Sequence, residues 1–256
     1  MTKEVGRYKH KEAYKMVTAH AHLVDRMYFF GKQKERYLKE TDFIKKVTQD
    51  YTKGNKIIDA GCGTGIHIML LREAGYDISG FDLRQEMVNV ARKRNPMSHI
   101  VQGDMRDFPI NEKADCITCM YGAINYLETE KDVKRTFDNF FNHLDPQGVA
   151  IIDTRSWNNL DEHVRTWVTD EWILAKQWIK GSKPMESAYR VFYAIPSEGV
   201  MEMEDHIQYF QDPFWLVDKL SHAGFSQTNI YENYNTDKKF NQNSNSHLPV
   251  IVAYKE

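Results

Sequence analysis

Three glycines that follow a short apolar segment at alternate positions are the residues of this chain best suited to bind a ligand. Residues 57–60 have the composition of a buried strand, and Gly61, Gly63 and Gly65 come directly after them. A helical pattern then runs over residues 66–74. Glycine allows positive φ angles and lets a ligand approach the backbone. A strand, a glycine turn and a helix N-terminus therefore predict a small-molecule site.

The spacing of these glycines does not fit a phosphate-binding turn. A dinucleotide fingerprint has the spacing G-x-G-x-x-G, but here the third glycine comes one residue early and Ile66 takes its place. The sequence also has no P-loop pattern. Asp59, just before the turn, would repel a phosphate and favours a ligand with positive charge. S-adenosylmethionine (SAM) has an ammonium and a sulfonium group and no phosphate, so we expect it to be the ligand.

Acidic residues end the next two strand-like segments. Residues 76–82 end in Asp82, which lies 23 positions after Asp59. A carboxylate at that distance is placed to accept hydrogen bonds from ribose hydroxyls. Residues 98–102 lead to Asp104 and Met105. A carboxylate and a thioether there suit the exocyclic amine and the ring face of an adenine.

These segments resemble the successive motifs of class I SAM-dependent methyltransferases. The resemblance covers residues ~55–155 and includes Asp59 to Gly65, Phe81-Asp82, residues 103–108 and residues 144–148. It implies an α/β fold with a Rossmann-like seven-stranded sheet and helices on both faces. It also implies SAM as cofactor and S-adenosylhomocysteine (SAH) as product.

The predicted cofactor contacts come from the strand ends and from an N-terminal lid. In the core they are Asp59, Gly61, Cys62, Gly63, Gly65, Asp82, Leu83, Asp104, Met105, Met120 and Tyr121. The predicted lid contacts are Tyr28 and Arg36.

The acceptor side is expected to follow the fourth strand. Residues 102–127 look most like the aminosugar N,N-dimethyltransferases, and Asp153-Thr154-Arg155 resembles the D-x-R motif of the glycine/sarcosine N-methyltransferases. Tyr126 is the predicted catalytic residue, as a proton acceptor or substrate contact; the alternative is an aromatic that only packs. Arg155 is predicted to bind a substrate carboxylate, or else to form a structural ion pair. The predicted substrate-binding residues are Tyr121, Asn125, Tyr126 and Arg155.

Three parts of the chain are expected to position these residues. Residues 1–53 form a helical lid, residues 54–160 and 212–256 form the SAM-binding core, and residues 161–211 form an inserted antiparallel sheet over the substrate site. Asp212 before Pro213 predicts the start of a helix. Several aromatic residues belong either to the core of the inserted sheet or to a substrate roof: Trp157, Trp167, Trp172, Trp178, Tyr189 and Tyr193.

The composition of the chain limits which partners and which cellular location we expect. The formal net charge of −2 comes without a dense basic block, which argues against a nucleic-acid substrate. No apolar segment approaches the ~20 residues of a membrane span, and the N-terminus lacks a signal peptide. Three cysteines favour a reducing cytoplasm, and a monomer or homodimer is expected. No metal is predicted, because Cys116 and Cys119 fall in a buried strand and His20 and His22 do not share a helix face.

The sequence therefore predicts SAM-dependent methyl transfer to a small-molecule amine, either an amino acid or an aminosugar. Two alternatives remain open at this point. One is a small-molecule O-methyltransferase, since SAM binding does not depend on the acceptor. The other is a non-catalytic SAM-binding subunit.

Overall fold

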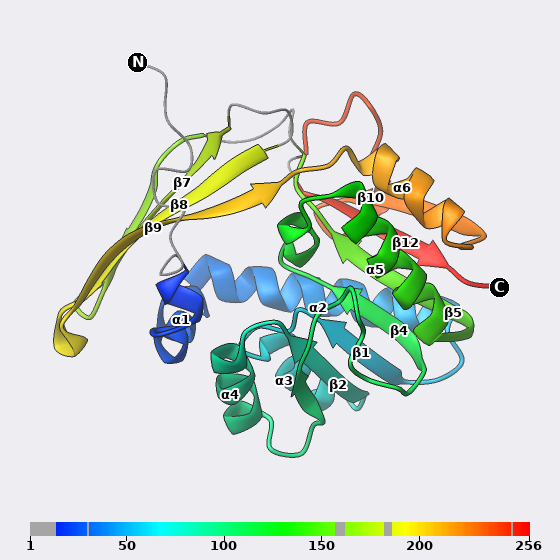
Figure 1. Cartoon of the computed structure of the whole chain (residues 1–256), viewed down its shortest axis with the longest axis horizontal. Helices are drawn as coiled ribbons and strands as arrows, with labels where there is room; N and C mark the ends of the chain where they lie inside the picture. Colours follow the sequence, from blue (N-terminus) through cyan, green and yellow to red (C-terminus); the bar gives the residue numbers. More distant parts are fainter. Residues whose placement is uncertain (1–13, 30, 157–161, 182–185, 247) are drawn as a thin grey trace.

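A mixed sheet runs through the main body of the molecule, and a second, antiparallel sheet extends from one end of it (Figure 1). The computed structural model describes residues 14–29, 31–156, 162–181, 186–246 and 248–256. In spatial order, the strands of the main sheet are β11 (Asn235–Lys239), β10 (Gln227–Glu232), β12 (Pro249–Tyr254), β5 (Leu144–Asp153), β4 (Ala114–Cys119), β1 (Lys56–Ala60), β2 (Asp77–Asp82) and β3 (Ile100–Gln102).

The five strands that come first in the chain, β1 to β5, are parallel to one another. β1 pairs with β2 and β4, β2 with β3, and β4 with β5, all in parallel, whereas β12 is antiparallel to both β5 and β10. Both faces are buried, so the central strands are continuous apolar runs. The predicted α/β fold is confirmed, and the carboxyl ends of β1, β2, β4 and β5 meet at one edge.

The described chain has eight strands in this sheet, one more than the sequence predicted. The extra strand, β11, folds back on β10 through Asn233 and Tyr234, whose φ angles are 49° and 57°. Consecutive residues with positive φ make the tight turn that suits a twisted hairpin. Asn233 is followed by Tyr234 rather than by glycine, so the usual Asn-Gly signal of such a turn is absent from the sequence.

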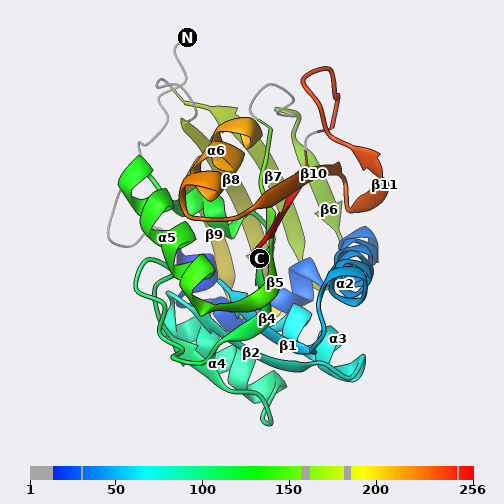
Figure 2. The ribbon, with the colours of Figure 1, turned by 90° about the vertical axis from the view of Figure 1, so that its right-hand side faces the viewer.

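Helices cover both faces of the main sheet, as Figure 2 shows. Helices α2 (Gly31–Tyr51), α3 (Ile66–Glu73) and α4 (Gln85–Arg94) pack on one face, and α5 (Glu130–His143) and α6 (Pro213–His222) on the other. The predicted apolar stripe of α5 is confirmed by buried Val133, Phe137 and Phe140. Asp212 caps α6, because its side chain accepts hydrogen bonds from the amides of Phe214 and Trp215.

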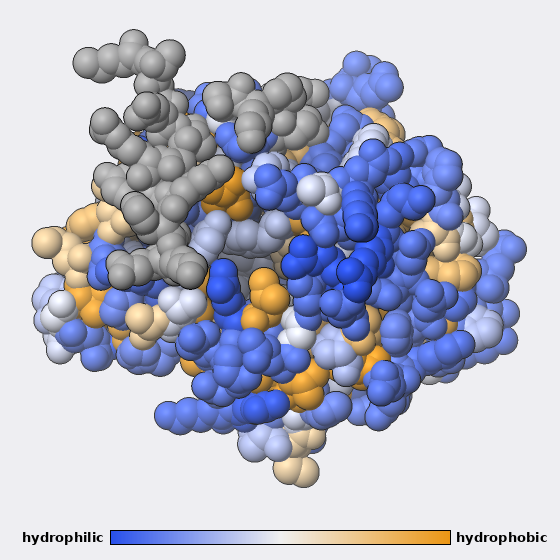
Figure 3. Space-filling model, viewed as in Figure 1, coloured by the Kyte–Doolittle hydropathy of each residue, from blue (hydrophilic) through white to orange (hydrophobic). Residues whose placement is uncertain are grey.

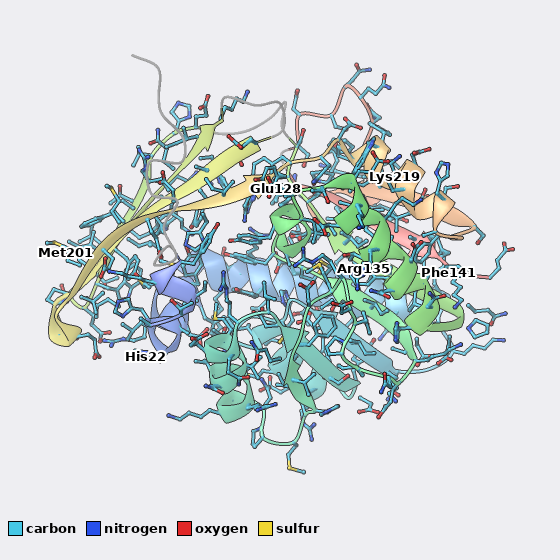
Figure 4. The ribbon with its side chains drawn as sticks, viewed as in Figure 1. His22, Glu128, Arg135, Phe141, Met201 and Lys219 are labelled. Carbon is cyan, nitrogen blue, oxygen red and sulfur yellow. The ribbon has the colours of Figure 1, made fainter. Side chains whose placement is uncertain are left out.

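The inserted sheet contains, in order, β6 (Arg165–Val168), β7 (Ile173–Lys180), β8 (Glu186–Ile195) and β9 (Val200–Tyr209). All its pairings are antiparallel. Met201 lies at its far tip, away from the main sheet (Figure 4). The aromatic residues divide between the two expected roles. Trp172 and Tyr193 are core, Trp167, Trp178 and Tyr189 line a cavity, and Trp157 lies outside the described residues.

The N-terminal segment packs against the inserted sheet. It consists of η1 (Lys15–Val17), η2 (Ala21–Leu23) and α1 (Val24–Tyr28), followed by α2, rather than two long helices. Met16, Leu23 and Met27 share an apolar cluster with β7 and β8. Lys15 pairs with Glu202 and Arg26 with Glu198. No helix of the described residues is long and apolar enough to cross a membrane.

Candidate active site

A cavity of about 920 Å³ lies between the glycine turn of the main sheet and the inner face of the inserted sheet. In Figure 3 the surface is hollowed between these two parts of the molecule. Glu128 lines the cavity where β9 approaches α5 (Figure 4). Its size suits a ligand site, and residues from the N-terminal segment, the main sheet and the inserted sheet all contribute to its wall.

The glycine turn forms the floor of the cavity. The amides of Gly61 and Cys62 both donate hydrogen bonds to the carbonyl of Phe81, at 2.8 and 2.9 Å, which ties the turn to the end of β2. Gly61 has φ +79°, and a Cβ there would lie 2.9 Å from Cβ of Ala123. Position 61 therefore requires glycine for two reasons: its φ angle is positive, and there is no space for a Cβ atom. Gly61, Cys62 and Gly63 line the cavity as predicted.

Gly65 does not line the cavity, so the structure does not support its predicted contact with the cofactor. It is the N-cap of α3 in a left-handed conformation, and a Cβ there would lie 2.6 Å from the amide nitrogen of Asn95. Its function is to start α3 against α4. The regular spacing of the three glycines suggested one shared role, but the third glycine serves packing.

Asp82 reaches into the cavity from the end of β2. Its Oδ2 accepts a hydrogen bond from the Gly63 amide and its Oδ1 accepts one from the Arg84 amide, both at 2.9 Å. Burial raises the pKa of Asp82, while the two amides favour its carboxylate. A carboxylate has about four acceptor positions, so Asp82 retains acceptor capacity for hydroxyl donors. Leu83 lines the cavity beside it.

Asp59 lies behind the glycine turn and does not line the cavity, contrary to its predicted direct contact with the cofactor. It is 1% exposed, and its Oδ1 accepts a hydrogen bond from Thr118 Oγ1 at 2.8 Å. Its Oδ2 is buried with no hydrogen-bond partner among the described residues. Asp59 therefore supports the glycine turn from behind, and burial raises its pKa.

Asp104 and Met105 line the cavity beyond Asp82, together with Met120 from the end of β4. Arg106 holds the Asp104 carboxylate in a fork, with Nε 3.0 Å from both oxygens and Nη2 2.6 Å from Oδ2. This pairing lowers the pKa of Asp104. The carboxylate is fixed in one orientation toward the cavity edge.

Arg36 and Tyr28 both line the cavity from the N-terminal segment. The Arg36 guanidinium contacts Glu40 at 2.5 Å and Asp153 at 3.2 Å, and it lies 4.1 Å from the centre of the Tyr121 ring. Tyr37 stacks on the same ring, with centroids 5.1 Å apart and planes at 9°. Tyr121 is thus held between a cation and a second aromatic ring.

The segment after β4 bends sharply before Tyr126. Tyr121 and Gly122 have φ angles of +61° and +75°, and Asp153 Oδ1 accepts a 2.6 Å hydrogen bond from the Gly122 amide. A tyrosine in the left-handed region is strained, so this contact fixes a costly conformation. The bend directs the Tyr121 ring into the cavity.

Asn125 does not line the cavity, so the structure does not support its predicted substrate contact. The side chain is fully buried, and its Nδ2 donates to Thr154 Oγ1 at 2.8 Å and to the Tyr209 carbonyl at 3.3 Å. Asn125 instead joins the segment after β4 to β5 and β9. One turn of 3₁₀ helix, η3 (Ala123–Tyr126), points it away from the cavity.

Tyr126 faces the cavity and contacts a histidine of the inserted sheet. Its hydroxyl lies 3.3 Å from His206 Nδ1, and His206 Nε2 lies 3.3 Å from Glu204 Oε1. Glu204 Oε1 also accepts a 2.8 Å hydrogen bond from the Met16 amide. His206 and Glu204 are 2% and 5% exposed. A tyrosine, a histidine and a carboxylate thus form a continuous row that begins at the cavity.

Arg155 lines the cavity from the segment after β5. Its guanidinium lies 4.7 Å from the centre of the Trp178 ring, and burial lowers its pKa. The predicted alternative, a structural ion pair, is absent among the described residues. The described residues also contain no group of three His, Cys, Asp or Glu side chains placed to hold a metal, and Cys116 and Cys119 are free and fully buried.

Residues 57–148, which carry the glycine turn, Asp82, Asp104 and Tyr126, match the family model described as "Methyltransferase domain". The matched part contains the same motifs that the cavity brings together. It is a class I SAM-dependent methyltransferase domain. Its cofactor is SAM.

Solved methyltransferase structures share this fold over most of the chain. The crystal structure of Streptomyces venezuelae DesVI superposes with a TM-score of 0.76 at 22% identity, covering 93% of this chain and 98% of that chain. SAM-bound CalS10, an amino pentose methyltransferase from Micromonospora echinaspora, has a TM-score of 0.67 at 19% identity, covering 87% and 91%.

Curated sequence relatives match over a shorter region. A dTDP-3-amino-3,6-dideoxy-alpha-D-glucopyranose N,N-dimethyltransferase of Streptomyces fradiae is 30% identical over 123 residues, 48% of each chain. A glycine/sarcosine N-methyltransferase of Halorhodospira halochloris is 36% identical over 114 residues, 42% of each chain. The chain spans about half the length of the curated relatives it matches.

The residues of the methyltransferase domain fit SAM. The Gly61 position leaves no space for a side chain, so a ligand can lie against the turn. Asp82 retains acceptor capacity for ribose hydroxyls, and the orphaned Asp59 Oδ2 gives the floor a negative potential that suits a ligand with two positive groups. In this domain Asp82, the glycine turn, Leu83 and Met105 would hold the nucleoside half.

Several residues that line the cavity or contact its lining were not found from the sequence. His67 lies in the apolar first turn of α3, where a buried histidine is unusual, and this was its only signal. Tyr37 is one of several aromatics in a long amphipathic helix. His206 and Glu204 lie on one face of β9 at a spacing of two, a pattern that marks a shared face only after the strand register is known.

His67 predicts a pH dependence of stability. Burial opposes its charged form, but its 2.8 Å contact with Glu40 raises the pKa of His67 above its usual value. A raised folded-state pKa gives stability that is complete below the unfolded value of about 6.5 and is lost as pH rises through the folded value. We expect the free energy of unfolding to fall as the pH rises from about 6.5 through the folded-state pKa of His67. Urea denaturation followed by circular dichroism across the window measures it.

The matched variants are His67→Gln and His99→Gln, because His99 is exposed. The fall of the free energy of unfolding with pH should disappear in His67→Gln and persist in His99→Gln. An unchanged slope in His67→Gln would show that another group causes it.

Proposed function

We propose that this protein transfers a methyl group from SAM to an amine nitrogen of a small molecule. One observation carries the proposal: a single cavity joins the SAM-binding floor to Tyr126 and His206 under the inserted sheet. The roof restricts the acceptor to a small molecule. The similar aminosugar and glycine/sarcosine enzymes are named as N-methyltransferases, which supports nitrogen as the target.

SAM supplies an electrophilic methyl group when it is bound. The residues of this chain then have two tasks, which are to orient the acceptor and to keep water out. Trp167, Trp178 and Tyr189 cover the cavity with apolar surface. Tyr121, held by Arg36 and Tyr37, gives a fixed wall beside the point where the acceptor nitrogen must approach.

An ammonium must lose a proton before it can act as a nucleophile. The tautomer of His206 with hydrogen on Nε2 leaves Nδ1 as an acceptor for the Tyr126 hydroxyl. Its Nε2 lies 3.3 Å from Glu204 Oε1 but makes no hydrogen bond among the described residues. A proton from the ammonium passes to the Tyr126 oxygen while the Tyr126 hydrogen passes to His206 Nδ1. The resulting imidazolium faces the Glu204 carboxylate, which stabilises it.

The cellular setting remains part of the proposal. Cys62, Cys116 and Cys119 are free and buried, which fits the predicted cytoplasmic location. A monomer or homodimer without a nucleic-acid partner fits the sequence composition.

A methylation screen tests the function. Purified protein and labelled SAM are incubated with amino acids, simple amines, nucleotide-linked aminosugars and matched hydroxyl compounds, and the products are read by mass spectrometry. We expect one or more methyl increments on nitrogen and an equal amount of SAH. Methylation of oxygen would instead assign the O-methyltransferase alternative. SAM binding without turnover of any acceptor would favour the non-catalytic alternative.

A further inference from the structure

Two basic side chains line the cavity and have no acidic partner in the described part of the chain. Arg155 comes from the segment after β5, and Lys176 comes from β7 of the inserted sheet. Among the described residues, neither side chain has a hydrogen-bonded or ion-paired carboxylate, and the charged neighbours that act on Lys176 are all arginines.

Three other partly buried arginines of the described residues pair with carboxylates. Arg36 contacts Glu40 and Asp153, Arg94 contacts Asp25, and Arg190 binds both oxygens of Asp205 at 2.7 and 2.8 Å. Each of these three arginines thus has a carboxylate partner, whereas neither Arg155 nor Lys176 has one among the residues that the structure describes. An enclosed charge without a partner costs free energy, so this pair calls for a counter-ion from outside the protein.

Aromatic rings hold both cations in place. Lys176 Nζ lies 4.1 Å from the centre of the Tyr28 ring and 4.9 Å from that of Trp167. Arg155 lies over Trp178. These contacts are cation–π interactions, which position a cation without neutralising its charge. Burial and the charge of Arg155 lower the pKa of Lys176, as expected for a buried cation that another cation repels.

We propose that Arg155 and Lys176 form an anion-binding subsite that recognises a phosphate or carboxylate group of the methyl acceptor. The proposal rests on the proposed function, because it assigns the subsite to the acceptor. It adds a residue of the inserted sheet to the predicted role of Arg155. It also narrows the acceptor to amines that carry a negative group.

The register of the inserted sheet places this subsite apart from the row formed by Tyr126, His206 and Glu204. Lys176 is aligned with Val191, and Val191 with Glu204, so Lys176 and Glu204 lie in one row on β7 and β9. Two strand spacings amount to about 10 Å. Tyr189, between Trp178 and His206 in the next row, separates the two groups. The acceptor therefore spans the roof, with its anionic group toward β7 and its amine toward β9.

Calorimetry on the SAH-saturated protein tests the subsite without any known acceptor. Inorganic pyrophosphate is the probe for phosphate, and acetate is the probe for carboxylate. We expect saturable binding of at least one probe, and a loss of about tenfold or more in Lys176→Met. Binding of pyrophosphate alone identifies a phosphate-bearing acceptor, and binding of acetate alone a carboxylate-bearing one.

Lys180→Met is the matched control, because Lys180 lies on the same strand and face but does not line the cavity. It should bind the probe as the parent protein does. Lys176→Arg keeps the positive charge and should bind the probe, which keeps the test decisive even if Lys176→Met does not fold. Circular dichroism reports the folding of each variant.

Two results would overturn the proposal. Equal affinity of the parent protein and both Lys176 variants would show that the cations do not bind the anion. Binding of a probe to the SAH-free protein that is lost in the SAH-saturated protein would assign the pair to the cofactor carboxylate. Neither result depends on methyl transfer, so a failed methylation screen with intact anion binding would reject only the proposed function.

Discussion

Replacing Asp82 with alanine should weaken SAM binding by about 1–3 kcal/mol, or roughly 5- to 150-fold in Kd. The Asp82 carboxylate is the acidic group of β2 that faces the cavity, and it holds the Gly63 and Arg84 amides at 2.9 Å. Its loss leaves ribose hydroxyls and these amides without an acceptor. Titration of SAM or SAH by calorimetry measures the change.

Asp77→Ala is the matched control, because Asp77 begins the same strand at its opposite, exposed end. That variant should bind SAM as the parent protein does. Asp82→Asn keeps the size of the side chain and one acceptor oxygen, so its loss should be smaller than that of Asp82→Ala. Unchanged affinity in Asp82→Ala would remove Asp82 from the cofactor site.

The floor of the site was predictable because its determinants are local. A strand, a glycine turn and the next acidic strand end occupy residues 57–82, and parallel pairing of β1 with β2 brings them together at one edge. Gly61, Gly63 and Asp82 therefore lie where the sequence placed them. Asp59 and Gly65 belong to the same motif but face inward, because the motif does not show which of its residues contacts the ligand and which supports the turn.

The roof was not predictable at the level of residues. Alternating patterns indicated antiparallel strands over residues 165–211, but a shift of one residue would reverse the face of every side chain. Lys176 and His206 enter the cavity only through the register of β7, β8 and β9. Asn125 was predicted to contact the substrate because it is next to Tyr126 in the sequence. The 3₁₀ turn instead rotates its side chain toward Thr154.

Replacing His206 with glutamine should lower kcat by about 100-fold or more while changing KM little, the effect of removing a general base. His206 acts through Tyr126, so it is a positioning residue and proton acceptor behind the substrate contact. Glutamine keeps a polar side chain but cannot accept and hold a proton. Steady-state kinetics with the acceptor found in the methylation screen measures the loss.

The pH profile separates this role from a merely structural one. Tyr14, Tyr126, Tyr189 and Glu204 are the titratable groups in contact with His206. If His206 removes the proton, the rate of His206→Gln should rise with pH until the acceptor amine loses its proton in solution, and should then approach the parent rate. A rate deficit that is constant with pH would mean that His206 only supports the shape of the cavity.

His222→Gln provides the control for the kinetics, because His222 is exposed on α6 and far from the cavity lining. Tyr126→Phe should reproduce the His206→Gln profile, since either change interrupts the same row between the cavity and Glu204. The double variant should then lose no more activity than the single ones, because residues that act as one unit are not additive. Additive losses would instead require two separate functions for Tyr126 and His206.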